Sequence, residues 1–197
     1  WKYAVESTLD AYLGQAPATF IYNGKLYSPK SFARKMIGIN PSDYFEVTSY
    51  SHLPFNEMVS LTIPANWNEK KYLNLPIGAF EKLINNALEN GYSLAWDGDA
   101  TEPEFDFEKG IAKLPNAQEK IKITQTLRQK TFEDKSTTDD HNMHIIGKAK
   151  DVNGIMYYIM KNSEGNNEMH GYVLMSKNAL LLKTISVLVH KDMLDLP

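Results

Sequence analysis

The sequence predicts an α+β fold in which helices and short hairpins come first and a twisted antiparallel sheet or small barrel comes last. Apolar residues recur at helical spacing within residues 1–13, 28–38 and 76–91. After residue 140 the chain becomes rich in branched and aromatic residues, which favour strands. The composition, with 43% hydrophobic and 23% charged residues, is that of a globular protein with a buried core.

The N-terminal part contains two predicted helices and one hairpin. Residues 1–13 place their apolar side chains on one helical face. Residues 20–27 predict a hairpin, because the Asn-Gly pair at their centre favours a tight turn. A second helix begins at Ser28 and Pro29, since serine caps helix N-termini and proline fits the first turn.

The middle of the chain alternates strand-like and helical patterns. Two β-rich stretches lie near residues 44–51 and 57–63, and a further strand is predicted at 92–96. Between them, Pro76 begins the clearest helix of the sequence. Its predicted buried stripe consists of Phe80, Leu83, Ile84, Ala87 and Leu88.

The C-terminal part is predicted to be mainly β. It follows an acidic segment, residues 97–110, which we interpret as a solvated loop, and a partly amphipathic helix at 117–132. The segment 176–183 is ambiguous between helix and strand. The predicted strands are residues 141–150, 155–162, 171–176 and 184–190.

Composition excludes several classes of function. The chain has 21 basic and 24 acidic residues, a net charge of −3, which argues against a nucleic-acid partner held by a basic surface. No apolar run approaches the roughly 20 residues that span a bilayer, so we expect no membrane partner. The chain contains no cysteine, which excludes disulfides, thiolate–zinc sites and a cysteine nucleophile of its own. We expect no cofactor.

The N-terminus and the compartment are left open. The sequence begins with Trp1 and shows no signal peptide, so we expect that the original N-terminus was removed or that the chain is part of a longer one. A chain without thiols suits either redox environment. A cytoplasmic location and a periplasmic or secreted location in a bacterium therefore both remain open.

The densest group of polar residues is TTDDHNMH, which contains Asp139, Asp140, His141 and His144. One interpretation is a metal site, and hence a metal hydrolase, built on the two aspartates and His141. Residues three apart on a strand point to opposite faces, so the side chains of His141 and His144 would point away from each other. We therefore predict that this segment binds no metal. No G-x-S-x-G elbow, phosphate loop or dinucleotide fingerprint is present.

A second interpretation is a catalytic imidazole at His141 with Asn162 as the group that orients its ring. A two-residue turn between the strands would place Asn162 opposite Ile145, about 13 Å along the strand from His141. A four-residue loop would place Asn162 opposite Met143, diagonal to His141 and within side-chain reach. The pair thus requires a longer turn or a bulge, and spacing alone favours a structural histidine.

These residues also carry a resemblance to a known family. The segments DDHNMHIIG, YYIMKNSEG and GYVLMS resemble the C-terminal half of papain-like cysteine peptidases. The segments YLNLPIGAFEKLINNALENGYSLAWDGDATE and FIYNGKLYSPKSFARKMIGINPSDYFEVTSY are similar to aminopeptidase C and bleomycin hydrolase, especially their smaller bacterial relatives. The resemblance covers nearly all of the chain and implies one papain-like peptidase region, residues 1–197.

The resemblance implies roles for individual residues. His141 matches the catalytic histidine and Asn162 the asparagine that orients it, while Asp140 precedes the histidine and is a candidate for tuning it. Asn142 and Asp99 are further candidates for tuning or for a substrate pocket. The family's cysteine and oxyanion-hole glutamine lie upstream, and no segment of this chain matches them.

The family's N-S-W-G motif is N-S-E-G here, so Glu164 stands where a tryptophan shields the Asn–His hydrogen bond. Two functional hypotheses follow. The first is the C-terminal portion of a cysteine aminopeptidase that hydrolyses peptide substrates, with the cysteine on an absent upstream segment and a possible homo-oligomeric assembly. The alternative is an inactive papain-like domain that binds peptides or a partner.

Overall fold

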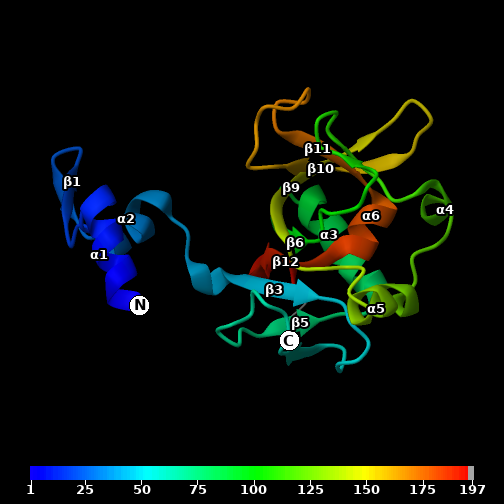
Figure 1. The fold of residues 1–197 in the computed structure, drawn as a ribbon, viewed down its shortest axis with the longest axis horizontal. Coiled ribbons are helices and arrows are strands. Elements are labelled where there is room, and N and C mark those ends of the chain that lie inside the picture. The colour runs from blue at the N-terminus through cyan, green and yellow to red at the C-terminus, as the bar shows by residue number, and fades with distance from the viewer. Residues whose placement is uncertain (195–197) are drawn as a thin grey trace. The chain divides into compact units, whose positions relative to one another are not determined.

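The structure is a computed structural model that describes residues 1–194, and it divides into two compact units, Trp1–Ser42 and Asp43–Pro197. The mixed α and β content confirms the predicted α+β class (Figure 1). No helix in the described residues is long and apolar enough to cross a membrane.

The first unit contains the predicted helices and hairpin. Ser28 caps its second helix as expected, since the side chains of Ser28 and Ser31 each accept a hydrogen bond from the other residue's backbone N–H. Aromatic rings of the hairpin pack edge-on against Phe32. The elements are α1 (Lys2–Leu13), β1 (Phe20–Tyr22), β2 (Lys25–Tyr27), α2 (Pro29–Phe32) and the π-helical turn η1 (Ala33–Ile37).

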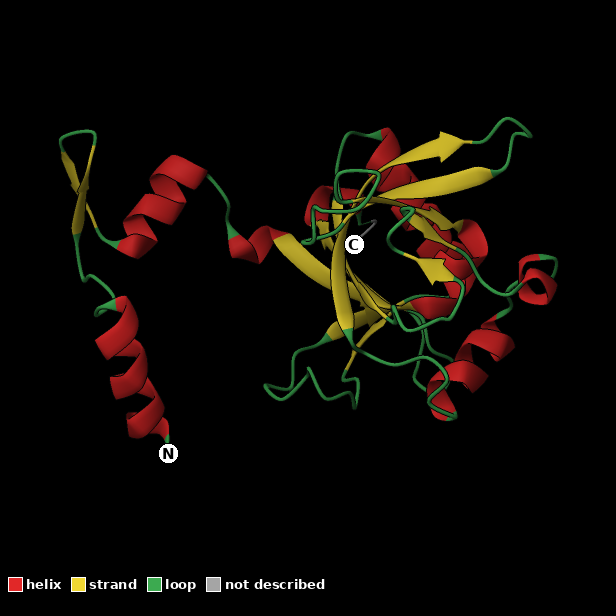
Figure 2. Cartoon of the chain, turned by 45° about the horizontal axis from the view of Figure 1, so that its top comes forward, coloured by secondary structure: helices red, strands yellow, loops and turns green. Residues whose placement is uncertain are grey.

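The second unit is built on a ten-stranded sheet. Figure 2 shows that this sheet is strongly curved, as expected for a barrel-like lobe. Most neighbouring strands are antiparallel, but β3–β5 and β8–β11 are parallel pairs. In sheet order the strands are β4 (Glu57–Val59), β5 (Tyr72–Asn74), β3 (Tyr44–Thr48), β12 (Thr184–His190), β6 (Leu94–Gly98), β9 (His141–Lys150), β10 (Met156–Lys161), β11 (Tyr172–Ser176), β8 (Ile111–Ala112) and β7 (Phe105–Asp106).

Helices close the inner side of the sheet. One core cluster joins buried side chains of β6, β9, β10, β11 and β12 to those of two helices. In the helix that begins at Ile77 the predicted buried stripe is confirmed. Four of its five residues are buried, and the fifth, Leu88, is partly buried. The helices and short turns of this unit are η2 (Pro41–Asp43, whose last residue begins the unit), α3 (Ile77–Glu89), α4 (Asn116–Glu119), α5 (Gln125–Glu133), α6 (Lys177–Lys183) and η3 (Lys191–Met193).

Three segments differ from the sequence-based prediction. The helix expected at 117–132 is divided into α4 and α5, because Thr124 starts a new helix by accepting a hydrogen bond from the Leu127 N–H. The ambiguous segment 176–183 is the helix α6, capped by the Ser176 side chain. The acidic segment 97–110 is not wholly a solvated loop, since it contains β7 and buries Phe105.

Truncation of Leu83 tests the packing of α3. Leu83 belongs to the main core and is 7% exposed. We expect Leu83→Ala to lower the free energy of unfolding by about 2–3 kcal/mol, the lower part of the range for buried leucines, because the side chain keeps some contact with water. Urea titration measures the loss, and Lys82→Ala on the exposed side of α3 is the matched control. A loss below about 1 kcal/mol would place this face of α3 outside the core.

Candidate active site

His141 and Asn162 lie on neighbouring antiparallel strands. His141 is the first residue of β9, and Asn162 directly follows the last residue of β10. The connecting loop, residues 151–155, is longer than a two-residue turn, and the strand register shifts at a bulge after Ile159. Beyond the bulge the register brings Asn162 opposite Met143 and diagonal to His141. The prediction that the pair needs a longer turn or a bulge is confirmed.

A hydrogen bond joins the two side chains. His141 Nε2 lies 2.9 Å from Asn162 Oδ1. The backbone N–H of Ser163 donates to the same Oδ1 at 2.8 Å, and this contact identifies the atom as the amide oxygen, because a backbone N–H can only donate. Nε2 of His141 therefore carries the proton and donates it to the amide. In the neutral ring Nδ1 is then the nitrogen with a free lone pair, and it is the atom able to accept a proton.

The backbone of Asn162 is also fixed. Its N–H donates to the carbonyl of Gly171 at 2.8 Å, which closes the loop between β10 and β11. Gly171 has a φ of +84°, and a Cβ there would lie 2.8 Å from the carbonyl oxygen of Glu164. Glycine is required at this position, and through it the loop holds Asn162, which is 7% exposed.

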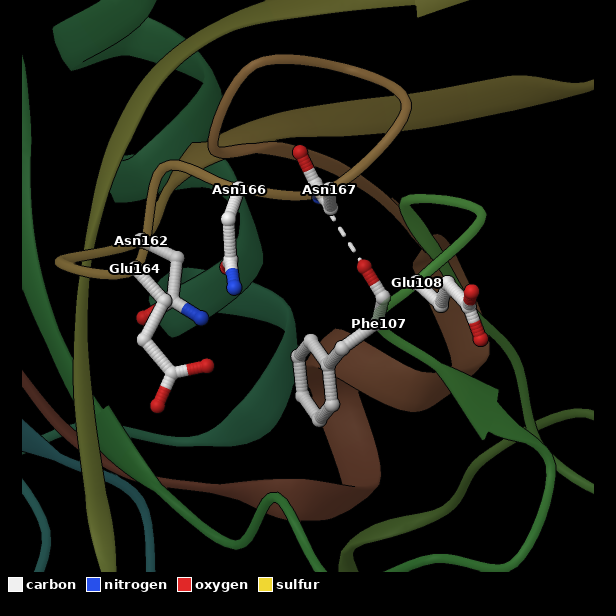
Figure 3. A pocket seen from close by; sticks show the side chains of 6 residues that line it. All are labelled: Phe107, Glu108, Asn162, Glu164, Asn166 and Asn167. Atoms are coloured by element: carbon white, nitrogen blue, oxygen red, sulfur yellow. Dashed lines mark hydrogen bonds between the residues drawn. The ribbon is translucent and has the colours of Figure 1, made fainter.

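Phe107 packs against the imidazole. Its ring centroid lies 6.2 Å from that of His141 in an edge-on arrangement. Phe107 follows β7, and Asn167 Nδ2 donates to its carbonyl at 3.0 Å, so the loop after β10 and the turn after β7 are joined next to the histidine (Figure 3). An aromatic side chain from a distant segment thus packs edge-on against the imidazole.

A cavity of about 280 Å³ opens beside this pair. Its walls come from the turn after β7 and the loop between β10 and β11. The lining residues are Phe107, Glu108, Asn162, Glu164, Asn166 and Asn167 (Figure 3). The cavity therefore borders the asparagine that orients His141 and contains amide, carboxylate and aromatic groups.

The other candidate residues have structural positions. Asp140 accepts hydrogen bonds from the Ala100 N–H at 3.0 Å and from the Thr138 hydroxyl at 2.5 Å, so it holds the loop before His141. Asn142 points to the opposite face of β9 from His141, as strand alternation requires, and it lines a different cavity. The structure therefore does not bring Asn142 to the His141 site.

Asp99 is buried in an ion pair. Its carboxylate lies 3.2 Å from Nζ of Lys183, and the two residues are 1% and 2% exposed. Asp99 also accepts hydrogen bonds from the Thr101 N–H and hydroxyl, at 2.8 and 2.6 Å. Burial raises its pKa, but the Thr101 hydrogen bonds and the Lys183 charge outweigh that effect and hold the pKa below its usual value. These contacts support a structural role rather than a substrate pocket.

The second cavity, of about 210 Å³, contains an unusual carboxyl group. Asp97 lines this cavity together with Asn142, on the face of the sheet opposite to His141. Its Oδ1 is buried without a hydrogen-bond partner among the described residues. Burial is the main reason that its pKa is raised to about 8, and a hydrogen bond with Asp139 and the charges of Asp139 and Glu46 raise it further. The folded protein therefore holds the Asp97 proton more tightly than an ordinary aspartate does.

This group makes stability depend on pH. The folded state holds the Asp97 proton up to a pKa of about 8, whereas an unfolded aspartate loses it near its ordinary value of 3.8. Between these values the native state binds more protons than the unfolded state, so stability falls as pH rises. We expect Asp97→Asn, which resembles the protonated form, to stabilise the protein by roughly 1–2 kcal/mol more at pH 8 than at pH 5, a value reduced for solvent screening.

Thermal unfolding of wild type and variant across this pH range measures the effect. Glu57→Gln, which removes an exposed carboxylate from the same sheet, is the control and should leave the pH dependence unchanged. Parallel pH profiles for wild type and Asp97→Asn would contradict the assignment.

Metal chemistry at the polar segment finds no support in the geometry. Asp139 accepts a hydrogen bond from the Ala65 N–H, while Asp140 faces Ala100 and Thr138. Within residues 1–194 no group of three or more histidine, aspartate or glutamate side chains could hold a metal ion.

Comparison with known proteins places the geometry in a family. The model of the Peptidase C1-like family matches residues 20–196. The chain belongs to the Peptidase C1-like family. It is a papain-like peptidase domain, and it contains the hydrogen-bonded pair of His141 and Asn162.

The solved structure of PepW agrees with this fold. PepW from Lactobacillus rhamnosis HN001 superposes with a TM-score of 0.77 at 20% identity, over 98% of this chain and 47% of that chain. The bromelain protease from Ananas comosus, solved with the E64 inhibitor, matches with a TM-score of 0.39 at 16% identity, over 95% of this chain and 67% of that one. This Peptidase C1-like chain thus spans about half the length of PepW. A search of curated proteins found no match.

The sequence patterns did not indicate every residue of this candidate site. Phe107, Asn166 and Asn167 come from segments assigned to loops, and no motif marks the two asparagines. The pattern Phe105-Asp-Phe107 within an acidic segment was the available signal, because two aromatic residues are unusual in a solvated loop.

Proposed function

We propose that this chain supplies the imidazole lobe of a cysteine aminopeptidase of the aminopeptidase C and bleomycin hydrolase type. The nucleophilic cysteine would lie on a segment of the same protein outside these 197 residues. The observation that carries the proposal is the hydrogen bond from His141 Nε2 to Asn162 Oδ1, which leaves Nδ1 available to a thiol.

The proposed chemistry divides the work between two segments. Nδ1 of His141 takes the thiol proton, and the resulting thiolate attacks the carbonyl carbon of the peptide bond. The imidazolium then returns that proton to the departing amine, which leaves an acyl-enzyme thioester. Water, deprotonated by the same nitrogen, attacks the thioester and releases the acid and the thiol. Asn162 keeps the ring in the orientation and tautomer that both proton transfers need.

Family membership and the PepW fold support the peptidase class, and the sequence resemblance supports the aminopeptidase type. The chain has no cysteine, so on this proposal it does not hydrolyse peptides by itself. An imidazole without a nucleophile or oxyanion donors lacks the groups that provide most of the rate acceleration.

An aminoacyl fluorogenic substrate tests the proposal. It should be turned over by the full protein and not by residues 1–197, and thiol-directed inhibitors should block that turnover. Intact mass of the natural protein identifies any cysteine-bearing segment that precedes Trp1. Turnover by the purified 197-residue chain would overturn the proposal, because another residue would have to act as nucleophile.

One observation favours a second function, an inactive papain-like domain that binds peptides or a partner. Glu164 replaces the family's tryptophan and lies on the wall of the cavity beside Asn162. On this alternative, joining a cysteine-bearing segment gives no turnover, and Glu164→Trp gives none either. The same substrate assay separates the two functions.

A further inference from the structure

The cavity beside Asn162 has the size of a subsite. Its volume of about 280 Å³ lies just below the roughly 300–1,000 Å³ of pockets that enclose whole small ligands. It is bounded by two segments that hydrogen bonds hold together, from Asn167 Nδ2 to the Phe107 carbonyl and from the Glu168 N–H to the Glu108 carbonyl. A cavity of this volume suits one side chain of a bound peptide.

Glu164 gives the cavity an uncompensated negative charge. Within residues 1–194 its carboxylate forms no salt bridge and no side-chain hydrogen bond, whereas the nearby Lys109 is paired with Asp106. Lys161, three residues before Glu164, donates to the His170 carbonyl and lies over the ring of Tyr172. Figure 3 shows the Glu164 carboxylate directed toward the cavity, while the Glu108 carboxylate points away from it.

The second observation is a buried amide that lacks a partner. Asn162 is 7% exposed, its Oδ1 accepts two hydrogen bonds, and its Nδ2 donates none among the described residues. In Figure 3 this nitrogen and that of Asn166 point into the cavity, opposite the ring of Phe107. Asp97 Oδ1 and Arg128 Nη2 are the fully buried side-chain atoms without a partner among the described residues, so Asn162 Nδ2 is open to the cavity, where a peptide carbonyl of a bound substrate would accept its hydrogen bond.

Together these groups match a basic residue. The amide nitrogens can donate to its backbone carbonyl, and the Phe107 ring can cover its methylene stem. The Glu164 carboxylate can pair with its charged head, which keeps access to water as long cationic side chains prefer. A glutamate or aspartate side chain would meet like charge in the same place.

The position of the cavity indicates which side of the scissile bond it serves. The departing amine must lie against His141 to receive a proton, and the cavity begins at the residue that holds His141 in place. We propose that this cavity is a subsite for a lysine or arginine side chain on the leaving-group side of the scissile peptide bond, an inference that rests on the proposed peptidase function.

Binding can be measured without turnover. The isotope-labelled 197-residue chain is titrated with Nα-acetyl-lysine methylamide and with its uncharged analogue Nα-acetyl-norleucine methylamide, and the NMR signals of the Phe107 ring and the Asn162 amide are followed. We expect the lysine probe to bind roughly two- to fivefold more tightly, as a partly exposed ion pair allows. This preference should decrease as salt rises.

Two glutamate variants identify the charge responsible. Glu164→Gln should remove the preference for the lysine probe, whereas Glu168→Gln, an equal change of charge on the same loop outside the cavity lining, should retain it. Equal binding of both probes, a preference that survives Glu164→Gln, or no shift of the Phe107 and Asn162 signals would each overturn the subsite.

The outcome is distinguishable from failure of the proposed function. Lysine-selective binding together with no turnover by the full protein would refute the peptidase function and leave a site for basic peptides. Turnover by the full protein without lysine selectivity would refute the subsite alone.

Discussion

Replacement of His141 by alanine in the full protein is expected to lower turnover of an aminoacyl fluorogenic substrate at least about 10³-fold. The imidazole would take part in every proton transfer of the proposed reaction, and no other described side chain donates a hydrogen bond to Asn162 Oδ1 or replaces Nδ1 next to it. The steady-state rate at saturating substrate measures the effect. A rate that falls less than about tenfold would remove His141 from the chemistry.

Two variants separate catalysis from folding. His144 lies three residues further along β9, is exposed and points to the opposite face, so His144→Ala should leave turnover unchanged. Asn162→Ala should lower turnover less than His141→Ala, by about 10- to 100-fold, because it removes the orientation of the ring and leaves the imidazole in place. Equal losses for His141→Ala and His144→Ala would indicate that β9 itself is disturbed.

Local patterns in the sequence predicted much of the fold. The Asn-Gly hairpin, the Ser28 cap and the stripe on α3 depend on interactions between residues close in sequence, and each is present in the structure. The contact between His141 and Asn162 could also be proposed from the sequence, because strand alternation and the family motif both relate the two positions. The spacing alone did not decide whether the register allowed the contact, but Gly147, which pairs with Ile159 at the bulge, was an available signal, because an isolated glycine in a strand often marks a bulge.

The remaining parts of the site depend on contacts between distant segments. Phe107 reaches His141 only because β7 and β8 join the far edge of the sheet, beside β11. Burial is the main cause of the raised pKa of Asp97, and Asp139 from the loop before β9 and Glu46 from β3 raise it further. No pattern of local spacing contains such information, and acidic residues that appear solvated in the sequence can be buried in the fold.

Asp99 is the clearest case, and its removal is expected to have the largest effect on stability. Asp99→Ala should lower the free energy of unfolding by about 3–5 kcal/mol, because the buried Lys183 ammonium would lose the more deeply buried of its two carboxylate partners. Glu102 also contacts Lys183 and is partly buried, so the loss should lie toward the lower end of that range. The Thr101 N–H and the Thr138 N–H would lose an acceptor as well.

Asp106→Ala is the matched control for this prediction. Asp106 also pairs with a lysine, Lys109, and accepts a hydrogen bond from the backbone N–H of the same residue. Its side chain, however, is 40% exposed. Its removal should lower the free energy of unfolding far less than removal of Asp99 does, as for other surface ion pairs. Urea titration of both variants at pH 7 makes the comparison. If Asp99 were a substrate-pocket residue, Asp99→Ala would keep wild-type stability and raise KM in the full protein.

The pH dependence supplies an independent check on Asp99. Because the net effect of its contacts is to lower its pKa in the folded state, its stabilising contribution is present above the ordinary aspartate value and is lost as pH falls through the lowered pKa. The difference in stability between wild type and Asp99→Ala should therefore be largest near neutral pH and shrink toward pH 3. A difference that stays constant into acid would mean that the aspartate is not held in its charged form by Thr101 and Lys183.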